Sequence, residues 1–148
     1  MNTNQDATSA FSHSVPGRAV VSTGHLSVGT PVVADLGYDV NDPYAVVAMF
    51  RTETQDVEWT FARDLLHDGL TEPTGDGDVH VWPCLDDEGR ATVTIELCSD
   101  GGDALVQLPT LAVAAFVDQM YTAVPAGTES EHVDLDRLLA EIQAAENA

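Results

Sequence analysis

Residues 44–61 decide the fold of this chain. They read Tyr44-Ala-Val-Val-Ala-Met-Phe-Arg51, then Thr52-Glu-Thr-Gln55, and then, after Asp56, Val57-Glu-Trp-Thr-Phe61. The first and last stretches are rich in the β-branched and aromatic residues typical of strands, and the polar segment between them favours a turn. Because so short a connection joins strands that run in opposite directions, the sequence predicts an antiparallel pair.

Similar patterns on both sides of this pair predict further strands and three helices. Residues 63–70, 110–121 and 135–142 are expected to be helical, and the last two segments repeat apolar residues at i, i+3, i+4 and i+7. Gly69 is expected to end the first helix in a left-handed conformation. The other predicted strands are residues 19–22 with an extension to 28, a strand beginning at 31–34, and residues 78–84, 92–98 and 104–108. The predicted order is ββββ-α-βββ-αα, an α+β fold built on an antiparallel sheet.

The two ends of the chain differ in character. Residues 1–17 are polar and show no periodicity, whereas residues 18–148 carry all the predicted elements. Hydrophobic residues make up 44% of the chain, which is enough for a folded core despite the charge. We therefore expect a flexible N-terminal tail over residues 1–17 and a single domain over residues 18–148.

The chain is strongly acidic, with 25 Asp and Glu residues against 5 arginines and no lysine, a formal net charge of −20. Such a charge repels phosphate groups, so nucleic acids and anionic membranes are disfavoured partners. The acidity either keeps the protein soluble, which is the simpler interpretation, or serves a basic partner. No secretory signal and no apolar run of membrane-spanning length are evident, so a reducing cytoplasm is expected.

A search for catalytic and metal-binding motifs gives a negative prediction. The 5 histidines and 2 cysteines show no ligand spacing, and Cys84 and Cys98 are expected to behave as small hydrophobic residues. Gly75-Asp-Gly-Asp78 lacks the later ligands of an EF-hand and predicts a turn. No nucleophile motif or phosphate-binding loop occurs either. We therefore expect no cofactor, no metal and no catalytic residue, and a binding protein rather than an enzyme.

Some apolar side chains require a covering surface. Residues 45–50 are apolar on both predicted faces, so Val47 and Met49 are expected to lie under another part of the chain or, alternatively, under a partner or second subunit. Trp82 points away from the apolar face of its strand and is the other candidate for a partner or subunit contact. Trp59 and Phe61 are expected in the core together with Val57, because the three share a strand face.

Two further surfaces are assigned from periodicity. In residues 92–98, Val93, Ile95 and Leu97 alternate with polar residues, which predicts a strand with one face in water. The apolar stripe of the C-terminal helix, Leu135, Leu138, Leu139 and Ile142, is expected to pack into the core, with docking onto a partner as the alternative.

Several short motifs together resemble a known family. They are Asp42-Pro-Tyr-Ala-Val46, Val57-Glu-Trp-Thr-Phe-Ala-Arg-Asp-Leu-Leu66, Gly69-Leu70, Pro73-Thr-Gly-Asp-Gly-Asp-Val79, Val81-Trp-Pro83, Val124-Pro-Ala-Gly-Thr-Glu129 and Asp134-Leu-Asp136. In this order, from about residue 36 to residue 142, they resemble the SsgA-like sporulation and cell division proteins of filamentous actinobacteria, the SsgB-type branch in particular.

This resemblance implies a barrel-like, whirly-type fold that assembles as a homotrimer. It further implies a non-enzymatic protein that helps to position sporulation septa by recruiting the tubulin-like GTPase FtsZ, aided by an SsgA-type paralogue, and that acts in the cytoplasm at the septum. Because the whirly-type fold binds single-stranded nucleic acid, such binding is the alternative function.

The residues that match the family motifs are given mostly structural roles. Pro43 is expected to fix a strand entry, Gly75 and Gly77 a turn, and Arg63 with Asp64 a local ion pair. The full set is Asp42, Pro43, Tyr44, Trp59, Phe61, Arg63, Asp64, Gly75, Gly77, Asp78 and Pro83.

Overall fold

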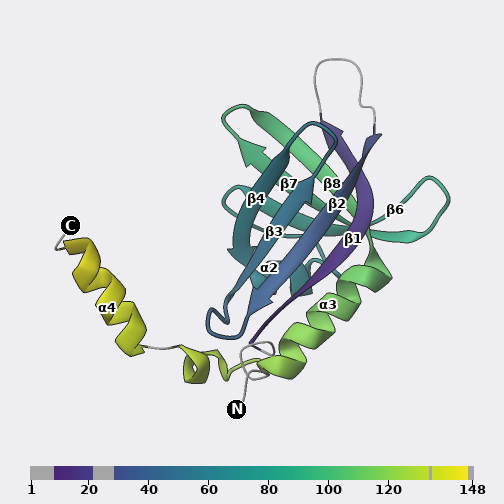
Figure 1. Ribbon diagram of the computed structural model, residues 1–148. Coiled ribbons are helices and arrows are strands. Elements are labelled where there is room, and N and C mark those ends of the chain that lie inside the picture. Colours follow the sequence, from purple (N-terminus) through teal and green to yellow (C-terminus); the bar gives the residue numbers. More distant parts are fainter. Residues whose placement is uncertain (1–8, 22–28, 134, 147–148) are drawn as a thin grey trace, which may run out of the picture.

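The structure is a computed structural model that describes residues 9–21, 29–133 and 135–146. Its centre is one antiparallel sheet of eight strands in the order β4-β3-β2-β1-β8-β7-β6-β5. The sheet curls into a half-barrel, with α2 and α3 against it and α4 standing apart from it (Figure 1). The predicted class, an α+β fold with an antiparallel sheet, is confirmed.

Four strands form the N-terminal half of the sheet. They are β1 (Ala10–Val21), β2 (Gly29–Asp39), β3 (Ala45–Arg51) and β4 (Asp56–Ala62). β3 and β4 form the hairpin that the sequence predicts, with Met49 opposite Glu58. β1 pairs with β2 along most of its length, and its residues 18–21 also pair with β8, so that β1 joins the two halves.

The prediction of a flexible tail is wrong for residues 10–17, which form the first part of β1. Phe11 and Val15 point into the core, while Ser12 and Ser14 lie on the other face. His13 also turns inward, where it bonds to Gln119 over 2.6 Å, and its polarity conceals the alternation expected of a strand. The predicted extension of this strand to residue 28 falls outside the described residues.

Four more strands form the C-terminal half: β5 (Thr74–Asp76), β6 (Val79–Leu85), β7 (Ala91–Ser99) and β8 (Gly102–Pro109). The sequence does not predict the short strand β5, because Gly75 favours a turn. Gly75 instead pairs with His80 across β5 and β6. The turn lies one step later, where Gly77 has a φ of 61°, a backbone angle that favours glycine.

Helix α2 (Arg63–Asp68) follows β4 directly, and α3 (Thr110–Ala123) follows β8. Gly69 ends α2, but the predicted left-handed conformation is wrong, since its φ is −67°. The reason for glycine here is close packing: a Cβ at this position would lie 2.2 Å from Cγ1 of Val81. Gly69 therefore lets α2 approach β6.

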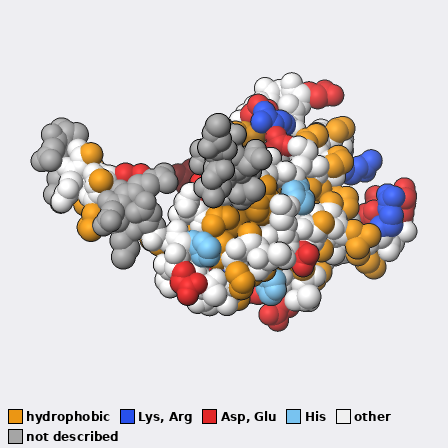
Figure 2. Space-filling view, turned by 60° about the horizontal axis from the view of Figure 1, so that its bottom comes forward, with side chains coloured by type: hydrophobic (Ala, Val, Ile, Leu, Met, Phe, Trp, Pro, Cys, Tyr) orange, Lys and Arg blue, Asp and Glu red, His pale blue; other side chains and the backbone are white. Residues whose placement is uncertain are grey.

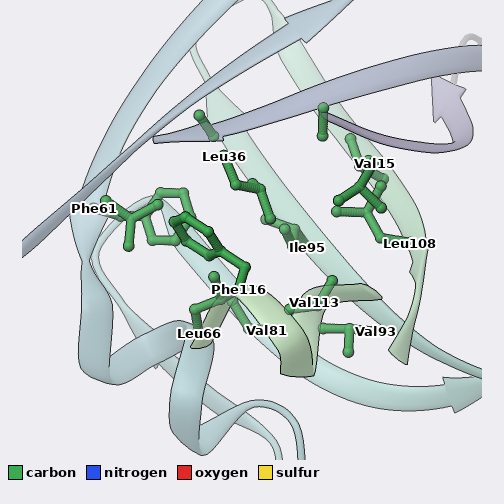
Figure 3. Packing of buried hydrophobic residues seen from close by; sticks show 14 of the residues in the cluster. Val15, Leu36, Phe61, Leu66, Val81, Val93, Ile95, Leu108, Val113 and Phe116 are labelled. Carbon is green, nitrogen blue, oxygen red and sulfur yellow. The ribbon is translucent and has the colours of Figure 1, made fainter. Parts of the chain in front are cut away.

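The core lies between the concave side of the sheet and α2 and α3. Val113, Phe116, Val117 and Met120 of α3 are all buried, as the predicted stripe requires. Figure 3 shows Phe116 pointing into this cluster, toward Leu66 of α2 and Val81 of β6. The same cluster takes in apolar residues of every strand except β5.

Two surface assignments on the sheet need correction. The side of β7 that was expected to be wet buries Thr92 and Thr94, because Trp82 and Cys84 of β6 lie directly across from them. The prediction that the rest of the chain covers the second face of β3 is wrong, because Val47 stays 38% exposed.

The predicted burial of Val57, Trp59 and Phe61 on β4 is confirmed for the second and third of these residues only. Phe61 is buried and Trp59 is half-buried against the core, as expected. Val57, at the start of the strand, is exposed instead. β4 is the edge strand at this end of the sheet, so none of the described strands lies beyond it to cover Val57.

The last correction concerns the C-terminal helix. The chain continues from α3 through a 3₁₀ helix, η1 (Glu129–His132), to α4 (Leu135–Glu146). Leu138, Leu139 and Ile142 are exposed, and α4 stands clear of the body at the left of Figures 1 and 2. The expectation that this stripe packs into the core is therefore wrong in the described chain.

Candidate functional site

The side of β1–β4 that faces away from the core forms one surface, here called the outer face. Its residues, fixed by the strand register, are Ser12, Ser14, Val33, Asp35, Gly37, Val47, Met49, Arg51, Glu58 and Thr60. Next to Val47 and Gly37 the surface is hollowed, with a volume of about 380 Å³ that Ala10, Asp39 and Ala45 help to line. The predicted contact residues Val47 and Met49 thus lie together on the outer face.

Charged side chains border the apolar part of the outer face. Arg51 forms ion pairs with Asp35 and, over 3.1 Å, with Asp56. A hydrogen bond from Ser14 and another from Arg51 hold the pKa of Asp35 below its usual value. Arg51 therefore binds carboxylates of its own chain, and the outer face presents apolar side chains beside acidic ones. Figure 2, a view with the bottom of Figure 1 turned forward, shows hydrophobic side chains in several exposed patches and acidic side chains mostly near the margins.

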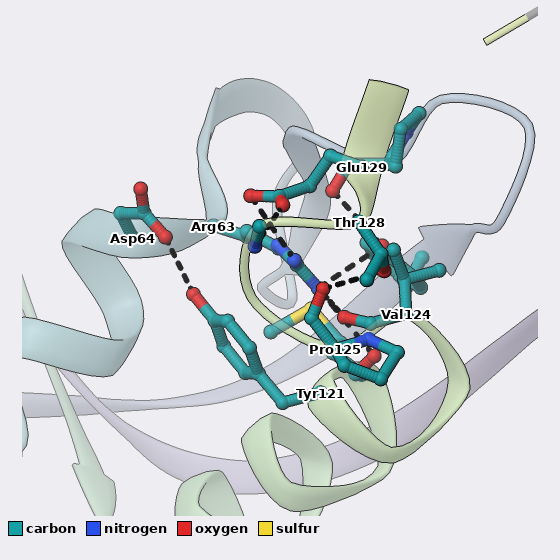
Figure 4. A network of polar contacts seen from close by, with 11 residues as sticks. Arg63, Asp64, Tyr121, Val124, Pro125, Thr128 and Glu129 are labelled. Atoms are coloured by element: carbon teal, nitrogen blue, oxygen red, sulfur yellow. Dashed lines mark hydrogen bonds and ion pairs between the residues drawn. The ribbon is translucent and has the colours of Figure 1, made fainter. Parts of the chain in front are cut away.

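A second group of motif residues surrounds Arg63, which is 1% exposed. Its Nη1 donates hydrogen bonds to the carbonyl oxygen of Val124 over 2.9 Å and to the hydroxyl of Tyr38 over 3.2 Å. Its Nη2 lies 3.4 Å from a carboxylate oxygen of Glu129, and its guanidinium lies 4.0 Å from the ring centre of Tyr121. These five residues are here called the Arg63 cluster, and Figure 4 labels four of them, Arg63, Tyr121, Val124 and Glu129.

The Arg63 cluster ties the Asp42-Pro-Tyr motif to the end of α3. The hydroxyl of Tyr38 donates a hydrogen bond to the carbonyl oxygen of Pro43 over 2.9 Å, and the backbone N–H of Arg63 donates to the carbonyl oxygen of Tyr44 over 2.8 Å. Burial raises the pKa of Tyr38. The turn before β3, the start of α2 and the segment after α3 are thus held at one point.

The predicted ion pair between Arg63 and Asp64 is wrong. Asp64 instead accepts a hydrogen bond from the hydroxyl of Tyr121 over 2.6 Å, on the outer side of the cluster. Burial, and then this bond to Asp64, raise the pKa of Tyr121. Consecutive residues in the first turn of a helix point in different directions. Arg63 therefore contacts Val124 and Glu129, whereas Asp64 contacts Tyr121.

Glu129 closes the cluster from the C-terminal side. Its own backbone N–H, the N–H of Gly127 and the charge of Arg63 hold its pKa below the usual value, against the opposing effect of desolvation. Sequence reasoning gave no role to Glu129, Tyr38 or Tyr121. Glu129 does end the Val124-Pro-Ala-Gly-Thr-Glu129 motif, and a carboxylate in a motif is a signal that could have paired it with Arg63.

Of the other predicted site residues, Asp42 helps to line the hollow of the outer face, whereas those of β6 and of the turn before it lie apart from both groups. Trp82 and Pro83 lie on β6 in the other half of the sheet, where Trp82 is half-buried opposite Thr94. Asp42 is exposed in the turn before β3, and Asp78 is exposed in the turn before β6. The structure thus brings together the Asp42–Tyr44 and Arg63–Asp64 motifs, but not the motifs of β5 and β6.

A third grouping was not foreseen from the sequence. His80, Glu96 and Cys98 place one ligand atom each within 4.8 Å of one another on β6 and β7. The spacing of these three residues in the sequence does not predict the set, because they become neighbours through the pairing of β6 with β7 and not through a local motif.

The buried Arg63 cluster is closed to solvent, whereas the outer face is open and presents Val33, Val47 and Met49 among polar and charged side chains. Exposed apolar side chains rimmed by polar ones are common on surfaces that contact other macromolecules. A family model described as "Streptomyces sporulation and cell division protein, SsgA" matches residues 32–129. The chain belongs to this family of sporulation and cell division proteins.

Curated relatives and solved structures agree with this assignment. The sporulation-specific cell division protein SsgB of Streptomyces coelicolor is 50% identical over 115 residues, which cover 77% of this chain and 83% of the relative. SsgB of Thermobifida fusca is 43% identical over 112 residues, covering 75% and 80%. These relatives are named as cell division proteins, not as enzymes.

Two solved structures share the fold. One, described in connection with SsgB mutations that correlate with longitudinal cell division during sporulation of Streptomyces coelicolor, gives a TM-score of 0.73 at 46% identity over 83% of this chain and 94% of that one. The other, an SsgA-like protein from Thermobifida fusca, gives 0.74 at 36% identity over 90% and 96%. Within the described residues, the helices lack the length and apolar character needed to cross a bilayer.

Proposed function

We propose that this sporulation and cell division protein positions septa by recruiting FtsZ to future division sites, as a homotrimeric adaptor without catalytic activity. The observation that carries the proposal is the 50% identity over 115 residues with SsgB of Streptomyces coelicolor. An SsgA-type paralogue would help to place the adaptor, and its place of action would be the cytoplasmic side of the septum.

The mechanism we propose is avidity. Three identical weak sites on one trimer hold neighbouring subunits of an FtsZ polymer at a high effective concentration, without any chemical step. The outer face supports this mechanism because it exposes Val47 beside an open hollow, and apolar side chains in such positions are favourable contacts. We assign the outer face to contact with FtsZ or with the neighbouring subunit.

Co-sedimentation with FtsZ polymers, together with light scattering, tests the proposal. We expect wild type to pellet with FtsZ in the presence of GTP and to have the mass of a trimer. Val47→Asp places a charge on the outer face and should weaken binding about tenfold or more, roughly 1.4 kcal/mol. Leu111→Asp is the matched control, because Leu111 is 87% exposed on α3, outside the outer face.

The two readouts separate the two contacts. Loss of pelleting by Val47→Asp with an unchanged mass assigns the outer face to FtsZ, and a fall to monomer mass assigns it to the subunit contact. Failure of the wild-type protein to pellet across a range of salt concentrations would refute direct recruitment. The single-stranded nucleic-acid alternative is not proposed, because the net charge of −20 opposes phosphate binding.

A further inference from the structure

His80, Glu96 and Cys98 lie on the convex side of the C-terminal half of the sheet, opposite the core-facing residues of the same strands. His80 is directly across from Glu96 in the β6–β7 ladder, and Cys98 follows Glu96 by two residues on the same side of β7. Opposite and diagonal neighbours on one face of a sheet are within reach of each other's side chains. The three donors therefore come from rigid, adjacent strands rather than from a loop.

Their spacing matches a metal-binding set. Nδ1 of His80 is 3.2 Å from Oε1 of Glu96, and the ligand atoms of all three residues lie within 4.8 Å of one another. In a tetrahedral zinc site with bonds of about 2.0–2.3 Å, ligand atoms lie about 3.3–3.7 Å apart. Small side-chain rotations would bring the sulfur to that distance.

The contact between His80 and Glu96 is not a well-formed hydrogen bond. Nδ1 of His80 is buried and has no hydrogen-bond partner of good geometry among the described residues, although the carboxylate oxygen is near. An imidazole nitrogen and a carboxylate oxygen that face each other at this distance are stable neighbours when a proton or a bound cation lies between them. This unsatisfied nitrogen is the observation that separates the group from an ordinary surface ion pair.

Gly75 fixes the imidazole of His80 in place. The ring lies over Gly75, its cross-strand partner on β5, so closely that a Cβ there would be 2.1 Å from Cδ2 of the ring. The motif glycine thus has a role that differs from a turn: it makes room for the ring whose Nδ1 faces Glu96. Metal-binding histidines are commonly held in one orientation by their surroundings.

We propose that His80, Glu96 and Cys98 form a binding site for a divalent transition-metal ion, and Zn²⁺ above all. One imidazole nitrogen, one thiolate and one carboxylate form a donor set that suits this borderline-soft ion. Asp103 lies across from Cys98 in the β7–β8 ladder and is the candidate fourth ligand, with water as the other. The net charge of −20 also favours binding of a cation.

Binding of Zn²⁺ and Co²⁺ to the untagged full chain, kept reduced, tests the proposal. We expect one ion per chain by titration calorimetry, and a near-ultraviolet thiolate-to-cobalt charge-transfer band in the Co²⁺ form. Cys98→Ser should abolish the band, and His80→Gln should weaken Zn²⁺ binding by about 100-fold or more, because even the loss of a residue that only supports a ligand costs 10–100-fold.

Cys84→Ser is the matched control. Cys84 is the other free cysteine, equally half-buried on the same side of β6, but outside the set. It should leave stoichiometry, affinity and the cobalt band unchanged, and near-ultraviolet circular dichroism checks that each variant is folded. Absence of saturable binding by the wild-type protein would overturn the proposal. Binding that survives both Cys98→Ser and His80→Gln would also overturn it, since the ion would then sit on other carboxylates.

Discussion

Arg63 shows how a single buried charge can organise several segments. A lone guanidinium in the core is costly, and it is stable only where carbonyl, carboxylate and aromatic groups surround it. Here those groups come from β2, from α3 and from the segment after α3. The sequence identified Arg63 as a motif residue but assigned it the wrong partner, because its true partners are distant in the chain and only the fold brings them near.

Replacement of Arg63 by alanine should lower the free energy of unfolding by about 3–5 kcal/mol, because Glu129 and the backbone carbonyl groups lose their partner. Arg90→Ala is the matched control. Arg90 pairs with Asp86 and Glu88 on the surface and is 71% exposed, so its loss should cost less than about 1 kcal/mol. Urea unfolding followed by circular dichroism measures both, and equal effects of the two variants would contradict the role of the Arg63 cluster.

At the scale of elements, α3 and α4 carry the same apolar spacing but have different environments. The stripe of α3 is buried, whereas Leu138, Leu139 and Ile142 of α4 are exposed. Spacing predicts the helix correctly in both cases, because it reflects local periodicity. The spacing does not predict which part of the protein covers the apolar stripe. The cover depends on where the segment before the helix places the helix relative to the sheet. The chain after α3 is fixed by Glu129 in the Arg63 cluster, and α4 begins beyond that point.

Truncation before residue 134 should therefore leave the stability of the body nearly unchanged, within about 0.5 kcal/mol in urea unfolding. A shorter variant whose last residue is 123 also lacks Val124 and Glu129. Its free energy of unfolding should be lower than that of the full chain by more than about 3 kcal/mol. If truncation before residue 134 already destabilised the protein strongly, α4 would have to pack on the body in solution.

Much of the fold was predictable from short-range patterns, and the failures share a cause. The β3–β4 hairpin and the buried stripe of α3 follow from alternation and helical spacing within one segment. The first part of β1 was missed because His13 occupies an inward position where an apolar residue was expected. The metal-ligand set of β6 and β7 was missed because its members meet only through strand pairing. Sequence patterns report on local geometry, and contacts across the sheet require the register.

For the whole molecule, the dominant electrostatic feature is the excess of 20 negative charges. Few basic side chains offset it: Arg51 and Arg90 bind carboxylates near them, and Arg63 is enclosed. The remaining acidic residues repel one another more strongly in the folded chain than in an expanded one. Self-repulsion therefore opposes folding, and the apolar core has to overcome it.

Added salt should consequently stabilise the fold. Between about 0.01 M and about 0.15 M NaCl the Debye length falls from roughly 30 Å to about 8 Å, which screens long-range repulsion more than close ion pairs. We expect the midpoint of urea unfolding to rise over this range, with KCl giving the same result. A midpoint that falls with salt would mean that the local pairs of Arg51 and Arg90 outweigh the repulsion.

The position of β1 has a consequence for how the chain reaches its final form during synthesis. β1 pairs with β2, its neighbour in sequence, and with β8, which the ribosome adds after the other seven strands. The β1–β4 half can therefore assemble while translation continues, whereas the seam between β1 and β8 closes only after all eight strands have emerged. Until then, one edge of β1 remains an open template, and the nascent protein depends on prompt arrival of β8 to cover it.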